Sequence, residues 1–132
     1  MKKNKLVIEI NKPVDVVFRF TVDPANTHKW FPFVLEEHTS EPVVKVGTIY
    51  TQKVKNENMQ ISENVVVVTG FVENTQLDFH SVNGTYTCCY RYESIPQGTR
   101  LTYSEENGVD GELEAPCTPQ VLKKLKELIE AL

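Results

Sequence analysis

TPQVLKKLKELIEAL, residues 118–132, is the stretch that decides the fold, because it is the clearest helix in the chain. Its apolar side chains recur at the spacing of a single helix face. They are Val121, Leu122, Leu125, Leu128, Ile129 and Leu132. Thr118 is suited to cap this helix and Pro119 to occupy its first turn. A helix with one apolar stripe must be covered, so the rest of the chain has to supply the covering surface.

The chain from Phe33 to Glu106 supplies this surface as six predicted strands. Turn-forming residues separate the strands near Glu41-Pro42, residues 56–58, Glu73-Asn74, Asn83-Gly84 and Gln97-Gly98. Asn83-Gly84 is the strongest of these signals, because both central positions of a type I′ turn need a positive φ. It predicts a tight hairpin between residues 77–82 and 85–94.

The N-terminal part adds one strand and two short helices. Alternating apolar residues predict a strand over residues 5–10. Helical spacing predicts an amphipathic helix over residues 13–22. A second short helix follows, capped by Asp23 and ended before Pro32. The predicted order is therefore βααββββββα, in one α+β domain that covers residues 1–132.

Three stretches within this order carry a resemblance to a known family. They are residues 8–18 (IEINKPVDVVF), Asp23-Pro24 together with Trp30, and residues 68–71 (VTGF). With the element order, they resemble the helix-grip fold of the START-like and polyketide cyclase (SRPBCC) superfamily. The resemblance implies a seven-stranded curved antiparallel sheet wrapped around the C-terminal helix, with a cavity between them. Because the helix spans only about fifteen residues, we expect a modest or partly open pocket.

The inward face of this sheet can be predicted from strand parity, because successive side chains point to opposite faces. Tyrosines and polar residues fall on that face: Tyr50, Gln52, Tyr86, Tyr90, Tyr92, Tyr103 and Glu105. An unpaired buried hydroxyl would cost about 1–3 kcal/mol. The pattern therefore indicates a hydrated pocket, a ligand, mutual hydrogen bonds, or rings whose hydroxyls reach solvent at a rim. The parity of residues 65–68 stays open, because all four are valine.

The residues predicted to bind a ligand come from this face and from the helices. They are Trp30, Tyr50, Gln52, Phe79, Tyr86, Cys88, Tyr90, Tyr103, Glu105, Leu122 and Leu125. Trp30 could equally anchor the core. Glu105 and Tyr103 are weak candidates for acid–base chemistry, because an apolar surface disfavours the charged form of a carboxylate. Cys88 is predicted to be buried and inert, and Cys117 to be the more reactive thiol.

The amino-acid composition argues against several classes of function. The net charge of −4 comes from 18 acidic and 14 basic residues and leaves no basic face for nucleic acid. No apolar run approaches the ~18 residues of a membrane span, and no signal peptide is recognised, so a cytoplasmic protein without membrane insertion is expected. The three cysteines and three histidines lack the spacing of a disulfide framework or a metal site. No cofactor is predicted, and the protein is expected to be a monomer or homodimer.

Three functions remain open. The leading hypothesis is the binding or transport of a small hydrophobic or aromatic ligand, because no catalytic constellation is recognisable. The alternative is a cyclase or hydratase that uses tyrosine and glutamate side chains in the cavity as acid and base. The second alternative is a protein-interaction module that uses the outer sheet face or the terminal helix.

Overall fold

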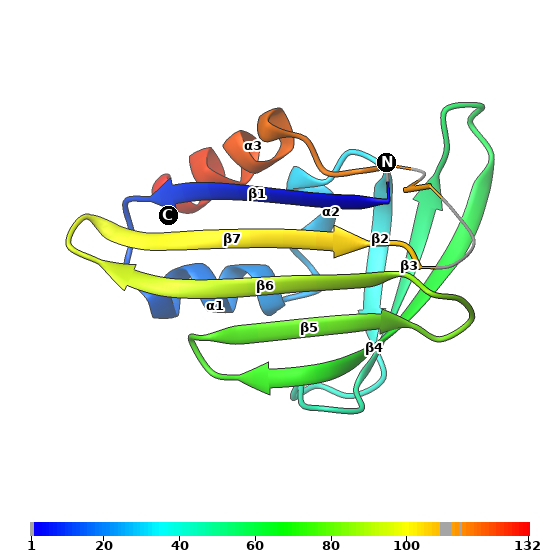
Figure 1. Ribbon diagram of the computed structural model, residues 1–132, viewed down its shortest axis with the longest axis horizontal. Coiled ribbons are helices and arrows are strands. Elements are labelled where there is room, and N and C mark those ends of the chain that lie inside the picture. The colour runs from blue at the N-terminus through cyan, green and yellow to red at the C-terminus, as the bar shows by residue number, and fades with distance from the viewer. Residues whose placement is uncertain (1, 109–111, 114) are drawn as a thin grey trace.

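The computed structural model describes residues 2–108, 112–113 and 115–132 (Figure 1). The strands are β1 (Lys3–Ile10), β2 (Val34–Thr39), β3 (Ile49–Lys55), β4 (Ile61–Val72), β5 (Gln76–Ser81), β6 (Thr87–Ile95) and β7 (Gly98–Glu106). The helices are α1 (Val14–Val22), α2 (Thr27–Trp30) and α3 (Pro119–Glu130). One antiparallel sheet of order β1-β7-β6-β5-β4-β3-β2 contains all seven strands. The predicted α+β helix-grip fold and its element order are confirmed.

The three helices lie on one side of the sheet, which curves so that β2, β3 and β4 turn away from the direction of β1 and β7 (Figure 1). Helix α3 contacts β1, α1 and α2. Half of its predicted stripe is fully buried, since Leu122, Leu125 and Ile129 are at most 1% exposed. Val121 and Leu128 are partly buried, and Leu132, beyond the end of the helix, is 65% exposed, contrary to the prediction. The Thr118 hydroxyl caps the helix by accepting a hydrogen bond from the Val121 amide at 3.3 Å. The helix ends at Glu130, slightly before the predicted end.

Polar contacts also hold α3 against β1, the first edge strand of the sheet. Lys126 Nζ donates a hydrogen bond of 2.6 Å to the Glu9 carbonyl. The Glu130 carboxylate accepts one of 2.8 Å from the Asn11 amide, just beyond β1. The helix therefore satisfies backbone groups that a free strand edge would expose.

The predicted tight turn at Asn83-Gly84 is wrong. Gly84 has a φ of 138°, but Asn83 does not adopt a positive φ, and the strands are joined by a longer loop over residues 82–86. This loop closes with a hydrogen bond from the Ser81 amide to the Tyr86 carbonyl. Contacts outside the hairpin hold the loop open, because the Thr85 hydroxyl donates to Asn107 Oδ1 after β7.

The second helix is shorter than predicted. Asp23 does not cap it: its carboxylate accepts from the Ala25 amide at 2.9 Å and stabilises the turn before the helix. The residue that precedes α2 is Asn26, so the helix is limited to a single turn ending at Trp30. Local hydrogen bonding by the Asp23 side chain thus competes with an earlier helix start.

The sheet register confirms the predicted inward face. Most of the residues predicted to face inward are buried, namely Tyr50, Leu77, Cys88, Tyr90, Tyr92, Leu101, Tyr103 and Glu105. The register also settles the valine run, since Val68 is 1% exposed and pairs with Phe79, which places Val66 and Val68 on the inner side. Beyond Val68 a register shift lets Phe71 face the core as well.

Leu125→Ala should lower the free energy of unfolding by about 2–5 kcal/mol, because it removes buried methyl groups from the centre of the α3 stripe. Leu132→Ala makes the same substitution at a side chain that is 65% exposed and should change stability by less than about 0.5 kcal/mol. Urea denaturation of both variants measures the difference. Equal effects would mean that the stripe is not the main contact of the helix.

Candidate functional site

Four rings from four strands form a continuous aromatic floor on the concave side of the sheet, consisting of Tyr50, Phe79, Tyr90 and Tyr103. The ring centroids of Tyr50 and Phe79 are 5.0 Å apart, those of Phe79 and Tyr90 6.2 Å, and those of Tyr90 and Tyr103 5.2 Å. All three pairs meet edge to face, the arrangement that ring quadrupoles favour. Phe79 alone among the four remains partly exposed.

Two tyrosine hydroxyls fasten the C-terminal end of α1 to the sheet. The Tyr50 hydroxyl donates to the Val22 carbonyl at 2.7 Å. The Tyr92 hydroxyl lies 2.6 Å from the Thr21 hydroxyl, which itself donates to carbonyls of α1, so Tyr92 is the donor. Burial raises the pKa of both tyrosines, which keeps them neutral. These two hydroxyls therefore find their partners on α1, whereas the predicted mutual hydrogen bond between inward side chains is the one from Tyr86 to Glu105.

Two other polar atoms in the interior have no protein partner among the described residues. The Tyr90 hydroxyl makes no hydrogen bond there, although the residue is only 8% exposed and burial raises its pKa. The buried Nε1 of Trp30 is also unpaired. Only Nε1 of Trp30 is fully enclosed and bears the cost of an unpaired buried polar group, whereas the Tyr90 hydroxyl keeps some access to water.

Glu105 is buried, as predicted, and its carboxylate accepts three hydrogen bonds. Oε1 accepts from the Tyr86 hydroxyl at 2.9 Å, and Oε2 accepts from Asn4 Nδ2 at 2.9 Å and from the Cys117 amide at 2.7 Å. These contacts tie β1, the loop before β6 and the chain entering α3 to β7. These hydrogen bonds compensate for the burial of the Glu105 carboxylate, so its burial needs no ligand as an explanation.

Cys117 is buried, contrary to the expectation that it is the more reactive thiol. It is 3% exposed, and burial together with the nearby Glu105 charge raises its pKa to about 12. Since the thiolate is the reactive form, Cys117 is protected rather than activated. Burial raises the pKa of Cys88 too, which agrees with the inert role predicted for it.

Glu37 on β2 has its carboxylate on the inner side of the sheet, a position that strand parity did not predict. It accepts hydrogen bonds from the Thr27 hydroxyl of α2 at 2.5 Å and from Nε2 of Gln52 on β3. Burial raises its pKa above the ordinary value of 4.5, and its charge adds to burial in raising the pKa of Tyr50 and Tyr90. The carboxylate therefore faces the aromatic floor.

A β-bulge explains why Glu37 was missed. The register of β2 shifts between Val34 and Glu36, so two residues of β2 oppose one on β3. Strict alternation from the buried Val34 would turn Glu36 inward and Glu37 outward, whereas the bulge reverses this. The segment VLEEHT has no apolar alternation from which a bulge could be read.

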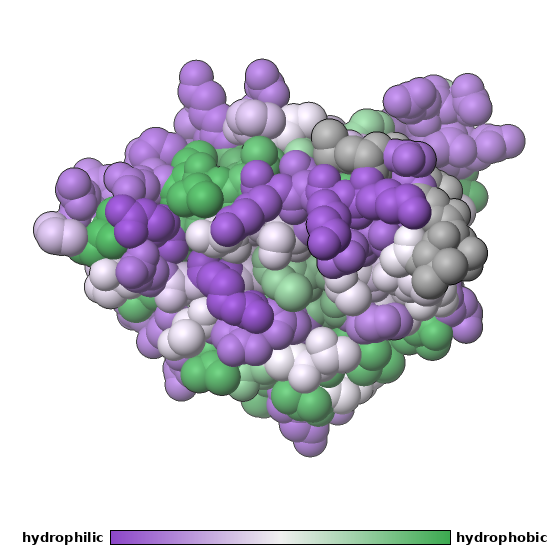
Figure 2. All heavy atoms as spheres, in the orientation of Figure 1, coloured by the Kyte–Doolittle hydropathy of each residue, from purple (hydrophilic) through white to green (hydrophobic). Residues whose placement is uncertain are grey.

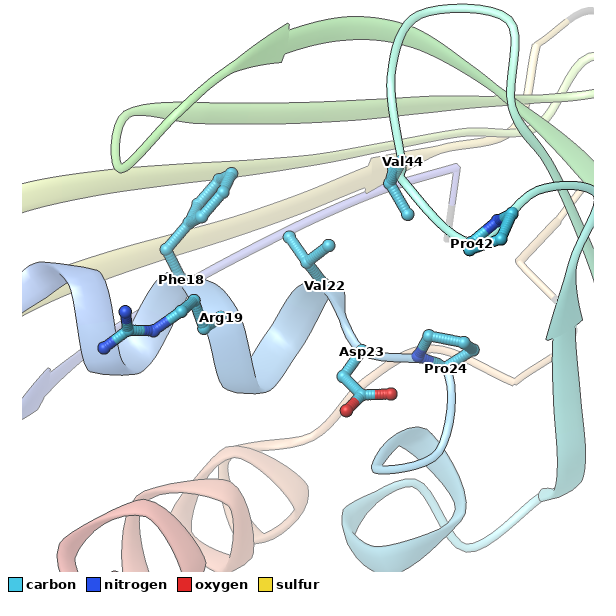
Figure 3. Close-up of a pocket in the computed structure, with 7 residues that line it drawn as sticks. All are labelled: Phe18, Arg19, Val22, Asp23, Pro24, Pro42 and Val44. Atoms are coloured by element: carbon cyan, nitrogen blue, oxygen red, sulfur yellow. The ribbon is translucent and has the colours of Figure 1, made fainter.

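The open hollows at the surface of the described chain include two with different lining residues. The first has a volume of about 300 Å³ and lies between α1 and the β2–β3 loop (Figure 3), lined by Phe18, Arg19, Val22, Asp23, Pro24, Pro42 and Val44. The second, of about 430 Å³, lies over the ends of β1, β6 and β7. Of the predicted ligand-binding residues, Glu105 lines the second and none lines the first. Most of the others, Trp30, Leu122 and Leu125 included, pack against one another in the core.

The outer face of the sheet is mixed in character, with hydrophilic side chains interspersed with apolar ones (Figure 2). It carries ion pairs from Arg91 to Asp78 and from Arg100 to Glu9 and Glu93. No helix in the described part of the chain combines the length and hydropathy needed to cross a membrane. Within residues 2–108, 112–113 and 115–132, no group of three or more His, Cys, Asp or Glu side chains is arranged to hold a metal ion.

Comparison with known proteins identifies the family of this chain. The model of the family described as "Polyketide cyclase / dehydrase and lipid transport" matches residues 1–132. The chain belongs to this family. No curated protein sequence matches it. Membership supports a hydrophobic ligand-binding module or a cyclase.

Solved structures share the fold at low sequence identity. Protein CV1439 of Chromobacterium violaceum superposes with a TM-score of 0.79 and 20% identity, covering 98% of this chain and 99% of that one. Protein NE0264 of Nitrosomonas europaea superposes with a TM-score of 0.75 and 16% sequence identity, covering 98% of this chain and 95% of that one. Ara h 8.0201 superposes with a TM-score of 0.71 and 14% sequence identity, covering 98% of each chain. These similarities establish the fold alone.

Glu105→Ala should lower the free energy of unfolding by about 2–4 kcal/mol, because it leaves the Tyr86 hydroxyl, the Asn4 amide and the Cys117 amide without their acceptor. The adjacent Glu106→Ala removes an exposed carboxylate whose ion pair with Lys3 spans 3.7 Å, so it should change stability by less than about 0.5 kcal/mol. Guanidinium denaturation at neutral pH compares the two. A small effect at both positions would contradict the role of Glu105.

The raised pKa of Glu37 predicts a pH dependence of stability. The folded state binds the proton more tightly than the unfolded state, so protonation favours folding below the ordinary pKa of 4.5, and this stability is lost as pH rises through the folded-state pKa. Glu37→Gln cannot titrate and should not show this loss. Denaturation between pH 4 and about pH 8 should show wild type losing stability relative to the variant as pH rises. Parallel curves would contradict the raised pKa.

Proposed function

We propose that this protein binds a small apolar or aromatic molecule against the aromatic floor, between the sheet and the helices. The observation that carries the proposal is the combination of partly exposed Phe79 with the unpaired Tyr90 hydroxyl on the inner side of the sheet. An inward aromatic surface with a few polar atoms is the usual composition of a small-molecule site. Membership of the polyketide cyclase and lipid transport family supports the same reading.

The ligand would reach the floor from the end of the sheet near the β3–β4 hairpin. Inward-facing side chains there remain partly exposed, namely Gln52, Val54, Val66, Phe79, Ser81 and Tyr86. Deeper in, α3 covers the sheet, and Leu125 is fully buried. A ligand about the size of one or two fused rings suits this half-open site better than a long lipid chain.

Binding rather than catalysis is proposed because the candidate acid and base are already committed. The Glu105 oxygens accept three hydrogen bonds from the protein itself. Burial raises the pKa of Tyr103 well above its ordinary value, so this hydroxyl would be slow to give up a proton. Trp30, the single tryptophan of the chain, lies in the same core cluster as Tyr50, Tyr90 and Tyr103 and supplies an intrinsic fluorescence signal.

Phe79→Ala should weaken the binding of 2-methylnaphthalene by about three- to tenfold, because the probe loses an edge-to-face ring contact. Trp30 fluorescence and calorimetry measure the affinity. Phe71→Ala is the matched control, since Phe71 packs against Phe18 with ring centroids 5.5 Å apart, under α1.

The control variant should bind the probe like wild type. An equal loss in both variants would point to a general effect on packing. If wild type binds no probe and native mass spectrometry of the purified protein shows no added small molecule, the proposed function fails.

A further inference from the structure

We propose that Asn83 is a site of spontaneous deamidation, and that the fold protects the other Asn-Gly pair of the chain from the same reaction. The two pairs are Asn83-Gly84, between β5 and β6, and Asn107-Gly108, after β7. Glycine after asparagine favours the reaction, because without a Cβ its amide nitrogen approaches the side chain freely. The two pairs share this local chemistry and differ in their surroundings. The inference does not depend on the proposed function.

The reaction needs only the chain and water. The Gly84 amide nitrogen loses its proton, attacks Cγ of Asn83 and forms a new C–N bond. The bond from Cγ to Nδ2 breaks, and the nitrogen takes up a proton and leaves as ammonia. Water then opens the resulting succinimide ring at either carbonyl, which gives aspartate or isoaspartate. Nothing is oxidised or reduced, so no further co-reactant is required.

The Asn83-Gly84 pair has both reacting groups free. Asn83 and Gly84 are exposed, in a loop that projects beyond the ends of β5 and β6 (Figure 1). The Asn83 side chain makes no hydrogen bond to any residue that the structure describes. The Gly84 amide, which would be the nucleophile, also donates to no described group. Neither group has to break a hydrogen bond with a described residue before the ring can close.

The Asn107-Gly108 pair is held by hydrogen bonds on both reacting groups. Asn107 Oδ1 accepts from the Thr85 hydroxyl at 2.8 Å, and Asn107 Nδ2 donates to the Glu112 carbonyl at 3.2 Å. The Gly108 amide donates to Thr85 Oγ1 at 3.2 Å. Thr85 thus engages both the electrophilic side chain and the nitrogen that would attack it. Deamidation at Asn107 therefore requires these contacts to open first.

The products would alter the loop that closes the β5–β6 hairpin. Either product adds a negative charge at residue 83, and isoaspartate also adds a carbon atom to the backbone path. In this loop the Ser81 amide donates to the Tyr86 carbonyl at 2.9 Å, and the Ser81 hydroxyl accepts from the Tyr86 amide at 3.1 Å. The modification therefore falls beside Tyr86, whose hydroxyl reaches Glu105.

The test incubates the whole folded chain at mildly alkaline pH, which favours loss of the amide proton. Peptide mapping by mass spectrometry measures the conversion of amide to acid at each position. Asn83 should convert about tenfold or more faster than Asn107, because the hydrogen bonds of Asn107 must open before it reacts. The same incubation in concentrated urea should bring the two rates close together, because unfolding removes the protection.

Two substitutions at Thr85 test the protection itself. Thr85→Val keeps the shape of the side chain and removes its hydroxyl, so it should speed conversion of Asn107 and leave the rate at Asn83 unchanged. Thr85→Ser is the matched control, because it keeps the hydroxyl and should leave Asn107 protected. Asn107 reacting equally in both variants, at either rate, would overturn the assigned role of Thr85.

Asn83→Gln identifies the reacting side chain. The longer side chain cannot close the five-membered ring, so conversion at residue 83 should be lost while Asn107 behaves as in wild type. Three results would overturn the inference: an Asn83 that stays unmodified in the folded chain, an Asn107 that reacts as fast, or a difference between them that persists in urea.

Discussion

The burial of the α3 stripe against the concave face of the sheet is the contact on which the rest of the structure depends. Leu122, Leu125 and Ile129 are almost completely removed from water, and α3 also contacts α1 and α2. The sheet curves around this helix, so the middle of its inner face becomes an interior. Every polar group that the sheet turns inward then needs a partner in a region with little water.

The polar groups on that face differ in how they are hydrogen-bonded. Tyr50 and Tyr92 use their hydroxyls to hold the end of α1, and Glu105 holds the chain that leads into α3. Glu37 and Trp30 are less completely satisfied, and both lie where α2 meets the sheet or the core. The contrast separates groups whose hydrogen-bonding capacity the fold uses up from groups that keep some of it.

Most of the fold could be predicted from the sequence because its signals are periodic. The apolar stripe of residues 118–132 indicates which side of the helix is buried, and the alternation in β5, β6 and β7 indicates which side chains face inward. The strand register confirmed the inward side chains. The features that escaped prediction are local departures from periodicity. The bulge in β2 hid Glu37, and contacts from Asn107 opened the loop at Asn83-Gly84. The reactivity of Cys117 was mispredicted because its surroundings are tertiary, and include Glu105, twelve residues away in sequence.

The bulge in β2 has a second effect, on how copies of this protein meet one another. An open sheet has two edges, and either can add a strand from a neighbouring molecule. At β1 the side chains of Lys126 and Glu130 occupy backbone groups near the end of the strand. At β2 the strand is short, and the bulge interrupts the regular spacing of its outward N–H and C=O groups. The irregularity that turns a carboxylate toward the interior thus also makes this edge a poor template for intermolecular strand pairing.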